Sequence, residues 1–92
     1  MSLRPVHSTR FHKDTRLAER RGKDLAKLRL VAGWLIEQTP LPPRFRDHPL
    51  LGEFKGYREC HIEPDWLLIY WIEDATGEIR FERTGTHSDL FG

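Results

Sequence analysis

The sequence predicts an α+β domain in which two N-terminal helices pack on one face of a small, mainly antiparallel, twisted sheet. Two observations predict it. Apolar residues recur at helical spacing over residues 10–38, and from Phe54 onward the pattern changes to an alternation with period two. The run WLLIYWI at 66–72 is short and rich in β-forming residues, which is typical of a buried central strand. Helices gathered before a run of strands give an α+β architecture.

The N-terminal part reads as a short edge strand followed by two helices. Residues 4–9 allow an edge strand, because Pro5 lacks an N–H and is tolerated at a strand start. Ser8 or Thr9 would cap a helix over residues 10–21, and Gly22 would end it. Residues 23–38 form the clearest helix, and we expect the two helices to make an antiparallel hairpin. The buried stripe of the second helix would comprise Leu25, Leu28, Ala32, Leu35 and Ile36.

The second half predicts a loop and then three strands in a meander. Four of the six prolines fall between residues 39 and 49, which makes that loop stiff. The first strand would place Tyr57, Glu59 and His61 on one side. A turn at 63–65 leads to the central strand 66–72, and a turn at 73–78 leads to a third strand at 79–84. We expect the chain to end in a tail that begins at a flexible Gly85 and finishes with the apolar pair Leu90 and Phe91. We also expect one sheet face to be free for function.

Length, cysteine content and hydropathy bound the class of protein. Ninety-two residues fit one domain spanning 1–92. Cys60 is the only cysteine, so no internal disulfide can form, which favours a reducing, cytoplasmic location. No apolar run approaches the ~20 residues of a membrane-spanning helix, and the N-terminus shows no signal peptide. We therefore expect a cytoplasmic protein without a membrane partner.

The charge is divided unevenly between the two halves. Residues 1–46 carry eleven Lys or Arg against four Asp or Glu, whereas residues 47–92 carry four against ten. A basic half points to a polyanionic partner, although a solvated helix face would give the same count. Charge alone leaves both interpretations open.

Three histidines and one aspartate are the candidates for catalysis. His48, His61, Asp65 and His87 would meet at one cleft of the sheet, with Asp65 close enough to His61 to orient it. Histidine exchanges protons near neutral pH, and cleavage of RNA needs a base and an acid but no cofactor, since the ribose 2′-OH is an internal nucleophile. We expect no cofactor. The candidate RNA-binding residues are two cations for phosphate and two aromatic residues for base stacking: Lys55, Arg83, Trp66 and Phe91.

Each of these residues also has a purely structural interpretation. His48 would then cap the loop, His61 would be a hydrogen-bonded strand residue near the core, and His87 would be a solvated tail residue. Asp65 would be a turn residue and Trp66 a core residue. A zinc site is a more specific alternative than these structural roles, since three His and one Asp are suitable ligands. None of the usual ligand spacings is present, and our expectation is that no metal is bound.

Two long strings resemble a known family. DHPLLGEFKGYRECHIEPDWLLIYWI at 47–72 and IRFERTGTHSDLFG at 79–92 resemble the YafQ-type toxins of the RelE/ParE superfamily, ribonucleases of bacterial type II toxin–antitoxin systems. The resemblance implies the same α+β fold. By motif it places His48, His61, Asp65 and His87 in proton transfer, Arg83 on the phosphate, and Trp66 and Phe91 near the base.

The resemblance also implies an activity and partners. The activity would be a ribosome-dependent, metal-independent mRNA interferase that cuts mRNA in the A site. The partners would be a cognate antitoxin, the ribosome, and operator DNA reached only through the antitoxin complex. Which histidine is base and which is acid, the codon preference and the stoichiometry of the complex stay open.

Two other classes of function compete with this interpretation. The first is a ParE-like toxin that binds DNA gyrase without being an enzyme, for which the histidine set is not needed. The second is an interaction module whose free sheet face binds a peptide.

Overall fold

The computed structural model describes residues 2–92. None of the helices in this range is long and apolar enough to cross a membrane. Two single-turn 3-10 helices, η1 (Pro43–Phe45) and η2 (Gly52–Phe54), flank the short strand β2. The other elements, in chain order with β2, are β1 (Arg4–His7), α1 (Thr9–Arg20), α2 (Leu25–Ile36), β2 (His48–Pro49), β3 (Arg58–Glu63), β4 (Trp66–Glu73), β5 (Glu78–Gly85) and α3 (His87–Phe91).

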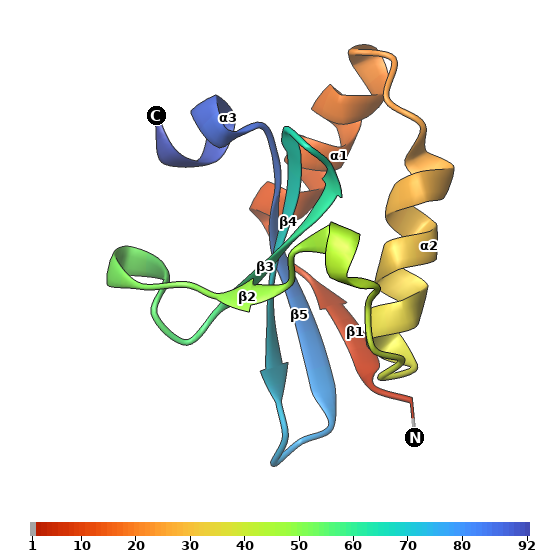
Figure 1. The fold of residues 1–92 in the computed structure, drawn as a ribbon, viewed down its shortest axis with the longest axis vertical. Helices are drawn as coiled ribbons and strands as arrows, with labels where there is room; N and C mark the ends of the chain where they lie inside the picture. Colours follow the sequence, from red (N-terminus) through yellow and green to blue (C-terminus); the bar gives the residue numbers. More distant parts are fainter. Residues whose placement is uncertain (1) are drawn as a thin grey trace.

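Within residues 2–92 the strands form one five-stranded sheet with the order β1-β5-β4-β3-β2 (Figure 1). The strands β3, β4 and β5 make the predicted antiparallel meander, and β4 is the central strand. β1 is the predicted edge strand and pairs in parallel with β5. The fold is the predicted α+β class.

The helix boundaries follow from their caps. The Ser8 hydroxyl accepts a hydrogen bond from the backbone N–H of Phe11 at 2.9 Å and starts α1. Gly22 follows α1 with φ 82°, a conformation that favours glycine. Asp24 caps α2 by accepting from the Ala26 N–H, so this helix begins at Leu25, the first residue of the predicted apolar stripe, and not at residue 23 as expected.

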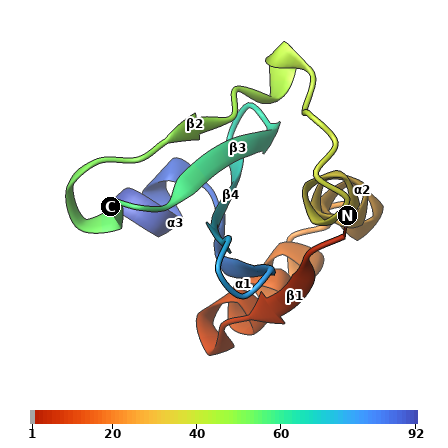
Figure 2. The same ribbon diagram turned by 90° about the horizontal axis from the view of Figure 1, so that it is seen from below.

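Alternate residues of β4 supply two apolar clusters. Leu68 and Tyr70 belong to the larger one, which includes residues of α1 and α2. Leu67 and Ile69 point to the opposite face, where they pack with Leu90 of α3. Figures 1 and 2 place α2 and α3 on opposite sides of β4. The face predicted to be free is therefore partly covered, and the candidate site occupies the remainder of it.

The helix α3 lies where a tail without a helix was expected after Gly85. The Thr86 hydroxyl accepts from the Asp89 N–H while the Asp89 carboxylate accepts from the Thr86 N–H, which makes a capping box. Asp89 also forms an ion pair with Arg21 of α1 at 2.7 Å, and Leu90 is buried. The prediction was wrong because the THSD string at 86–89 is itself a helix start, and because Leu90 has a cluster to join.

Candidate active site

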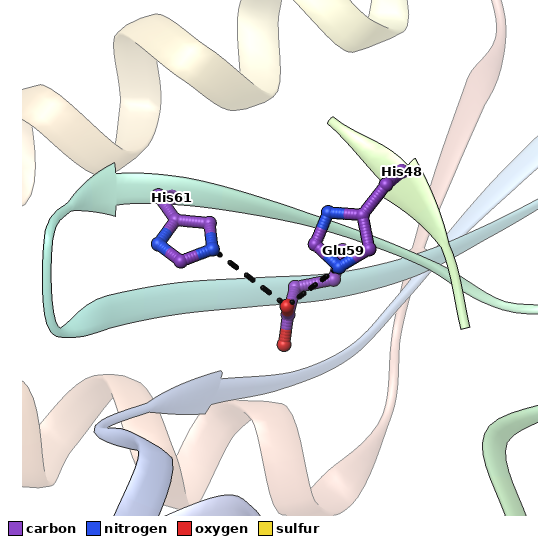
Figure 3. A group of neighbouring side chains, drawn as sticks. All are labelled: His48, Glu59 and His61. Atoms are coloured by element: carbon purple, nitrogen blue, oxygen red, sulfur yellow. Dashed lines mark ion pairs between the residues drawn. The ribbon is translucent and has the colours of Figure 1, made fainter. Parts of the chain in front are cut away.

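The pairing of β2 with β3 brings two histidines to one carboxylate. His48 of β2 lies opposite Glu59 of β3 in the sheet register, and His61 is two residues further along β3 on the same face. Figure 3 shows both imidazole rings pointing toward the Glu59 carboxylate. The two-residue strand β2 therefore fixes the place of His48 in the site.

Both imidazoles present the same ring nitrogen to Glu59. Glu59 Oε2 lies 3.1 Å from His48 Nε2 and 3.8 Å from His61 Nε2. The other ring nitrogen, Nδ1, donates to a backbone carbonyl in each case, at 2.5 Å to Arg46 and at 3.2 Å to Pro64. A carbonyl oxygen can only accept, so Nδ1 carries the hydrogen in both rings. The side chains of Glu59 and His61 are only 6% and 10% exposed and are shielded from water, whereas the His48 side chain is 44% exposed.

A second pair lies at the start of α3. Asp65 Oδ1 accepts from Nδ1 of His87 at 2.5 Å and from the His87 backbone N–H at 2.9 Å. The pKa of the Asp65 carboxyl lies below its ordinary value, first because of the backbone hydrogen bond from His87 and then because of the ring hydrogen bond. The expectation that Asp65 orients His61 is wrong, because His61 already donates to Pro64 and the carboxylate faces His87.

The His61 ring connects the two pairs. Its centroid is 6.2 Å from that of His48 and 5.7 Å from that of His87. The structure thus brings together His48, His61, Asp65 and His87, and adds Glu59, which was not proposed from the sequence. The sequence contained a signal for Glu59, since Glu59 and His61 are two residues apart and therefore lie on the same side of the strand.

Two proposed RNA-binding residues are used for packing. Trp66 is 1% exposed and donates from Nε1 to the Thr84 hydroxyl at 3.0 Å, so neither ring face is available to a base. The Arg83 guanidinium donates two hydrogen bonds to Asp14 of α1, at 2.6 and 3.2 Å, so its planar fork is occupied by a carboxylate. The sequence shows an arginine suited to bind phosphate, but it cannot show that a side chain of an N-terminal helix binds Arg83.

The other two proposed RNA-binding residues lie at the surface. Lys55 is exposed directly after η2. Phe91 in α3 is 49% exposed and packs edge-to-face on Phe54, with ring centroids 5.7 Å apart. Half of the Phe91 surface is therefore open to a ligand, while the other half is fixed by an aromatic neighbour.

Asp47 anchors the segment that carries His48. The Tyr70 hydroxyl donates to Asp47 at 2.6 Å, and Arg58 donates to the same oxygen at 3.2 Å. Burial of Tyr70, followed by its contact with Asp47, raises the pKa of the phenol above its ordinary value, so it stays a donor. The loop is thus tied to the central strand one residue before His48.

A groove of ≈ 490 Å³ opens beside His61, between α2 and the turn that joins β3 to β4. Its volume falls in the range of small-molecule sites. It combines an apolar floor with a basic rim. The lining residues are Lys27, Leu30, Val31, Arg44, Phe45, Arg46, His61, Ile62, Glu63 and Pro64.

Comparison with known proteins identifies the family. The family described as "Bacterial toxin of type II toxin-antitoxin system, YafQ" matches residues 3–92. The mRNA interferase toxin YafQ of Escherichia coli K12 is 52% identical over 87 residues, which cover 94% of this chain and 92% of that protein.

Solved structures agree with this match. The E. coli DinJ-YafQ toxin-antitoxin complex contains a chain with 48% identity and a TM-score of 0.91, with full coverage of both chains. A metal-bound toxin from Helicobacter pylori has 42% identity and a TM-score of 0.91, covering 97% of this chain and 99% of that one. The chain belongs to the YafQ family of bacterial type II toxin–antitoxin toxins, whose curated E. coli members are mRNA interferases, that is, endoribonucleases.

Proposed function

We propose that this toxin is a ribosome-dependent endoribonuclease that cuts mRNA in the A site by acid–base catalysis without a metal. The observation that carries the proposal is the row of three imidazoles, with Glu59 beside the rings of His48 and His61 and Asp65 beside the ring of His87. The E. coli K12 relative is named an mRNA interferase toxin, which supports the choice of RNA as substrate.

The reaction needs two proton transfers on opposite sides of one phosphate. The 2′-OH attacks the adjacent phosphorus, and the bond to the 5′-oxygen breaks. The products are a 2′,3′-cyclic phosphate and a 5′-OH. Because the nucleophile is tethered beside the phosphorus, the protein has to supply a base, an acid and stabilisation of the developing charge.

The His48–Glu59–His61 cluster is suited to accept the proton of the 2′-OH. Glu59 supplies a buried negative charge beside two Nε2 atoms, at 3.1 and 3.8 Å, and the fixed Nδ1 hydrogens leave those atoms to exchange protons. The three side chains would act as one unit.

His87 is suited to protonate the leaving 5′-oxygen. Asp65 accepts the Nδ1 hydrogen of this ring, which directs Nε2 away from the carboxylate as the atom that would pass a proton to the leaving oxygen. His87 is more than half exposed, so a substrate can reach it.

The surface around the three histidines would bind the mRNA. Phe91 offers an exposed ring face for a base, and Lys55 offers an ammonium for a phosphate. The groove beside His61 would take the nucleotide next to the scissile phosphate, with its base on the apolar floor and its phosphate on the rim of Arg44 and Arg46.

The exposed faces of α1 and α2 would dock on ribosomal RNA. Several basic side chains are exposed there and make a cationic surface that attracts polyanions. They are Arg10, Lys13, Arg16, Arg20, Lys27 and Arg29.

A cognate antitoxin would be the protein partner, because a similar toxin has been solved in a toxin-antitoxin complex. We propose that operator DNA is reached only through that complex. No observation favours the gyrase-binding or peptide-binding alternatives, neither of which needs the histidine row.

The test is primer extension on a reporter mRNA in a translating extract, with wild type and His87→Ala compared. Cuts at fixed codon positions that require ribosomes and vanish with His87→Ala are the expected result. His12→Ala is the matched control, since His12 is an exposed histidine of α1 outside the row. Cuts that persist unchanged in folded His87→Ala protein would remove His87 from the mechanism.

A further inference from the structure

We infer that four aromatic side chains form a stacking surface that extends the RNA-binding site from Phe91 to Trp71 and binds unpaired bases of the mRNA. This aromatic row consists of Phe91 in α3, Phe54 in η2, Tyr57 just before β3, and Trp71 in β4. The choice of mRNA as the ligand rests on the proposed function, whereas the surface itself stands on geometry. Trp71 is the residue that the inference adds to the site, and Phe54 and Tyr57 position it.

Each ring of the aromatic row contacts the next one edge to face. From Phe91 to Trp71 the successive ring centroids are 5.7, 6.1 and 5.6 Å apart. The successive interplanar angles are 86°, 89° and 65°, which is an arrangement that aromatic pairs prefer. Side chains from three separate segments of the chain therefore fix one another's orientation before any ligand binds.

The aromatic row lies on the sheet face that carries the three histidines. Tyr57, Glu59 and His61 follow one another at intervals of two residues, so their side chains point to the same side of the sheet. At the other edge of the site, Phe91 follows His87 by four residues and shares one side of α3 with it. The aromatic row therefore continues directly from the proposed catalytic residues.

The two ends of the aromatic row are open to solvent, whereas its middle is not. Phe91 is 49% exposed and Trp71 is 41% exposed. Phe54 and Tyr57 are half-buried and pack on the apolar cluster that contains Ile69. Only three ring-to-ring steps separate the exposed ends, which is the length of a few nucleotides when successive bases are about 3.4 Å apart. Two bases of one strand can therefore stack on both ends at once.

Exposed rings at this spacing fit a single strand of nucleic acid better than a protein partner. An unpaired base offers its flat face to an aromatic side chain, whereas the bases of a duplex cover one another's faces. A stable protein interface takes about 800 Å² from each partner. A whole aromatic side chain has roughly 150–250 Å², so the half-exposed rings of Phe91 and Trp71 offer far less.

The charges beside the aromatic row indicate that it binds bases rather than phosphates. Arg80, which pairs with Trp71 across the sheet, forms an ion pair with Glu82 at 2.7 Å. Exposed Lys55 and Glu53 lie on either side of Phe54 in the chain and carry opposite charges. A phosphate therefore meets little net positive charge here, and stacking has to supply the affinity.

The first experiment follows the indole N–H signals of ¹⁵N-labelled, antitoxin-free toxin during titration with an octanucleotide of 2′-O-methyl RNA. This probe is single-stranded and cannot be cleaved, because it has no free 2′-OH. The Trp71 signal should shift and saturate, while the signal of buried Trp66 should shift much less. An octamer of abasic sites, which has the phosphates but no bases, should leave Trp71 unchanged. A Trp71 signal that stays in place at 1 mM octamer, or that shifts equally with the abasic octamer, would overturn the inference.

Variants then separate stacking from apolar bulk, with folding checked by circular dichroism and affinity measured at the Phe91 backbone N–H. Trp71→Leu should weaken octamer binding at least fivefold, whereas Trp71→Phe keeps an aromatic ring and should weaken it less than twofold. A dinucleotide is too short to span the aromatic row and should bind Trp71→Leu as it binds wild type. Leu51→Ala removes another exposed apolar side chain and is the matched control. Equal losses in Leu51→Ala and Trp71→Leu would show that stacking is not the cause.

A cleavage assay in the translating extract tests the link with function. Trp71→Leu should raise the KM for mRNA at least fivefold and leave kcat within twofold, because the stacking surface binds substrate away from the scissile bond. An unchanged KM would mean that the mRNA does not reach the aromatic row. If only the antitoxin shifts the Trp71 signal, the surface is a protein interface and the inference is wrong. If the toxin cuts no RNA at all, the proposed function fails while the octamer titration still decides whether the aromatic row binds bases.

Discussion

Asp65 Oδ1 lies 2.5 Å from Nδ1 of His87, although 22 residues separate the two in the chain. Asp65 belongs to the turn between β3 and β4, and His87 opens α3. The same carboxylate accepts the His87 backbone N–H, so it fixes both the ring and the first turn of the helix. The proposed acid is therefore oriented by a turn of the central hairpin.

Asp65→Asn should slow single-turnover cleavage at least tenfold, because the amide can present its NH₂ group to Nδ1 and no longer fixes the ring hydrogen and the ring orientation. The free energy of unfolding should change little, since both side chains are more than half exposed. The pKa of Asp65 is lowered, so the carboxylate is charged throughout the neutral range and the effect should appear at every pH near 7. Asp74→Asn, an exposed turn substitution, is the control.

Glu59→Gln should separate activity from stability. Cleavage should fall by a factor of about 10²–10⁴, the range for loss of a general base. The free energy of unfolding should stay within about 1 kcal/mol of wild type or rise, since the substitution removes a buried charge with an unpaired oxygen. Urea denaturation and single-turnover cleavage measure the two quantities. Unchanged cleavage would show that Glu59 is only structural.

Arg83 should contribute through Asp14 rather than through RNA. Both side chains are nearly buried, with 12% and 13% exposed, and their bidentate contact joins β5 to α1. A double-mutant cycle with Arg83→Ala and Asp14→Ala should give a coupling of about 1–3 kcal/mol in the free energy of unfolding. If Arg83→Ala raises the KM for RNA and shows no coupling with Asp14, the guanidinium binds phosphate after all.

Asp89 should make the stability depend on pH in the acid range. Its hydrogen bond with Arg21, followed by that with the Thr86 N–H, lowers the pKa of the carboxyl to about 2. A lowered pKa stabilises the folded state fully above the unfolded-state value near 3.8, and the contribution is lost as the pH falls toward about 2.

The contribution of Asp89 to the free energy of unfolding is about 1 kcal/mol, since Arg21 is partly exposed and the solvent weakens the ion pair. Urea denaturation of wild type and Asp89→Asn at pH 6 and pH 2.5 measures it. The wild type should lose about 1 kcal/mol more than the variant between these values. Equal losses would show that Asp89 is not the titrating group.

A negative charge in the groove should repel RNA. Leu30 lines the groove and is half-exposed, so Leu30→Glu should fold and raise the KM for RNA about tenfold, with a smaller effect on kcat. Ala75→Glu makes the same change of charge on the exposed β4–β5 turn and should leave KM unchanged. Equal effects of the two variants would mean that only net charge matters.

The sequence predicts the elements well because their signals are local. The helical stripe, the run at 66–72 and the Ser8 cap each depend on residues a few positions apart, and the structure confirms them. The three histidines are also found together as expected. Their proton-transfer partners were not predictable, because the pairing of β2 with β3 and of Asp65 with His87 is set by tertiary structure.

The contacts of the candidate RNA ligands have the same origin. Trp66 and Arg83 have the residue types of RNA ligands, and only the packed structure shows that they donate hydrogen bonds to Thr84 and Asp14. The missed helix α3 is different, since its capping box is local. A helix of five residues is stable here because Leu90 packs on the sheet, and no local pattern contains that contact.

The parallel pairing of β1 with β5 has a consequence for biosynthesis. The Ser8 hydroxyl donates to the backbone carbonyl of Glu82, 74 residues further along the chain. The first strand therefore has no partner in the sheet until nearly the whole chain has emerged from the ribosome that makes it, and His87 emerges later still. A nascent chain interrupted before β5 can form neither the complete five-stranded sheet nor the histidine row, so the proposed catalytic residues meet only when synthesis is almost complete.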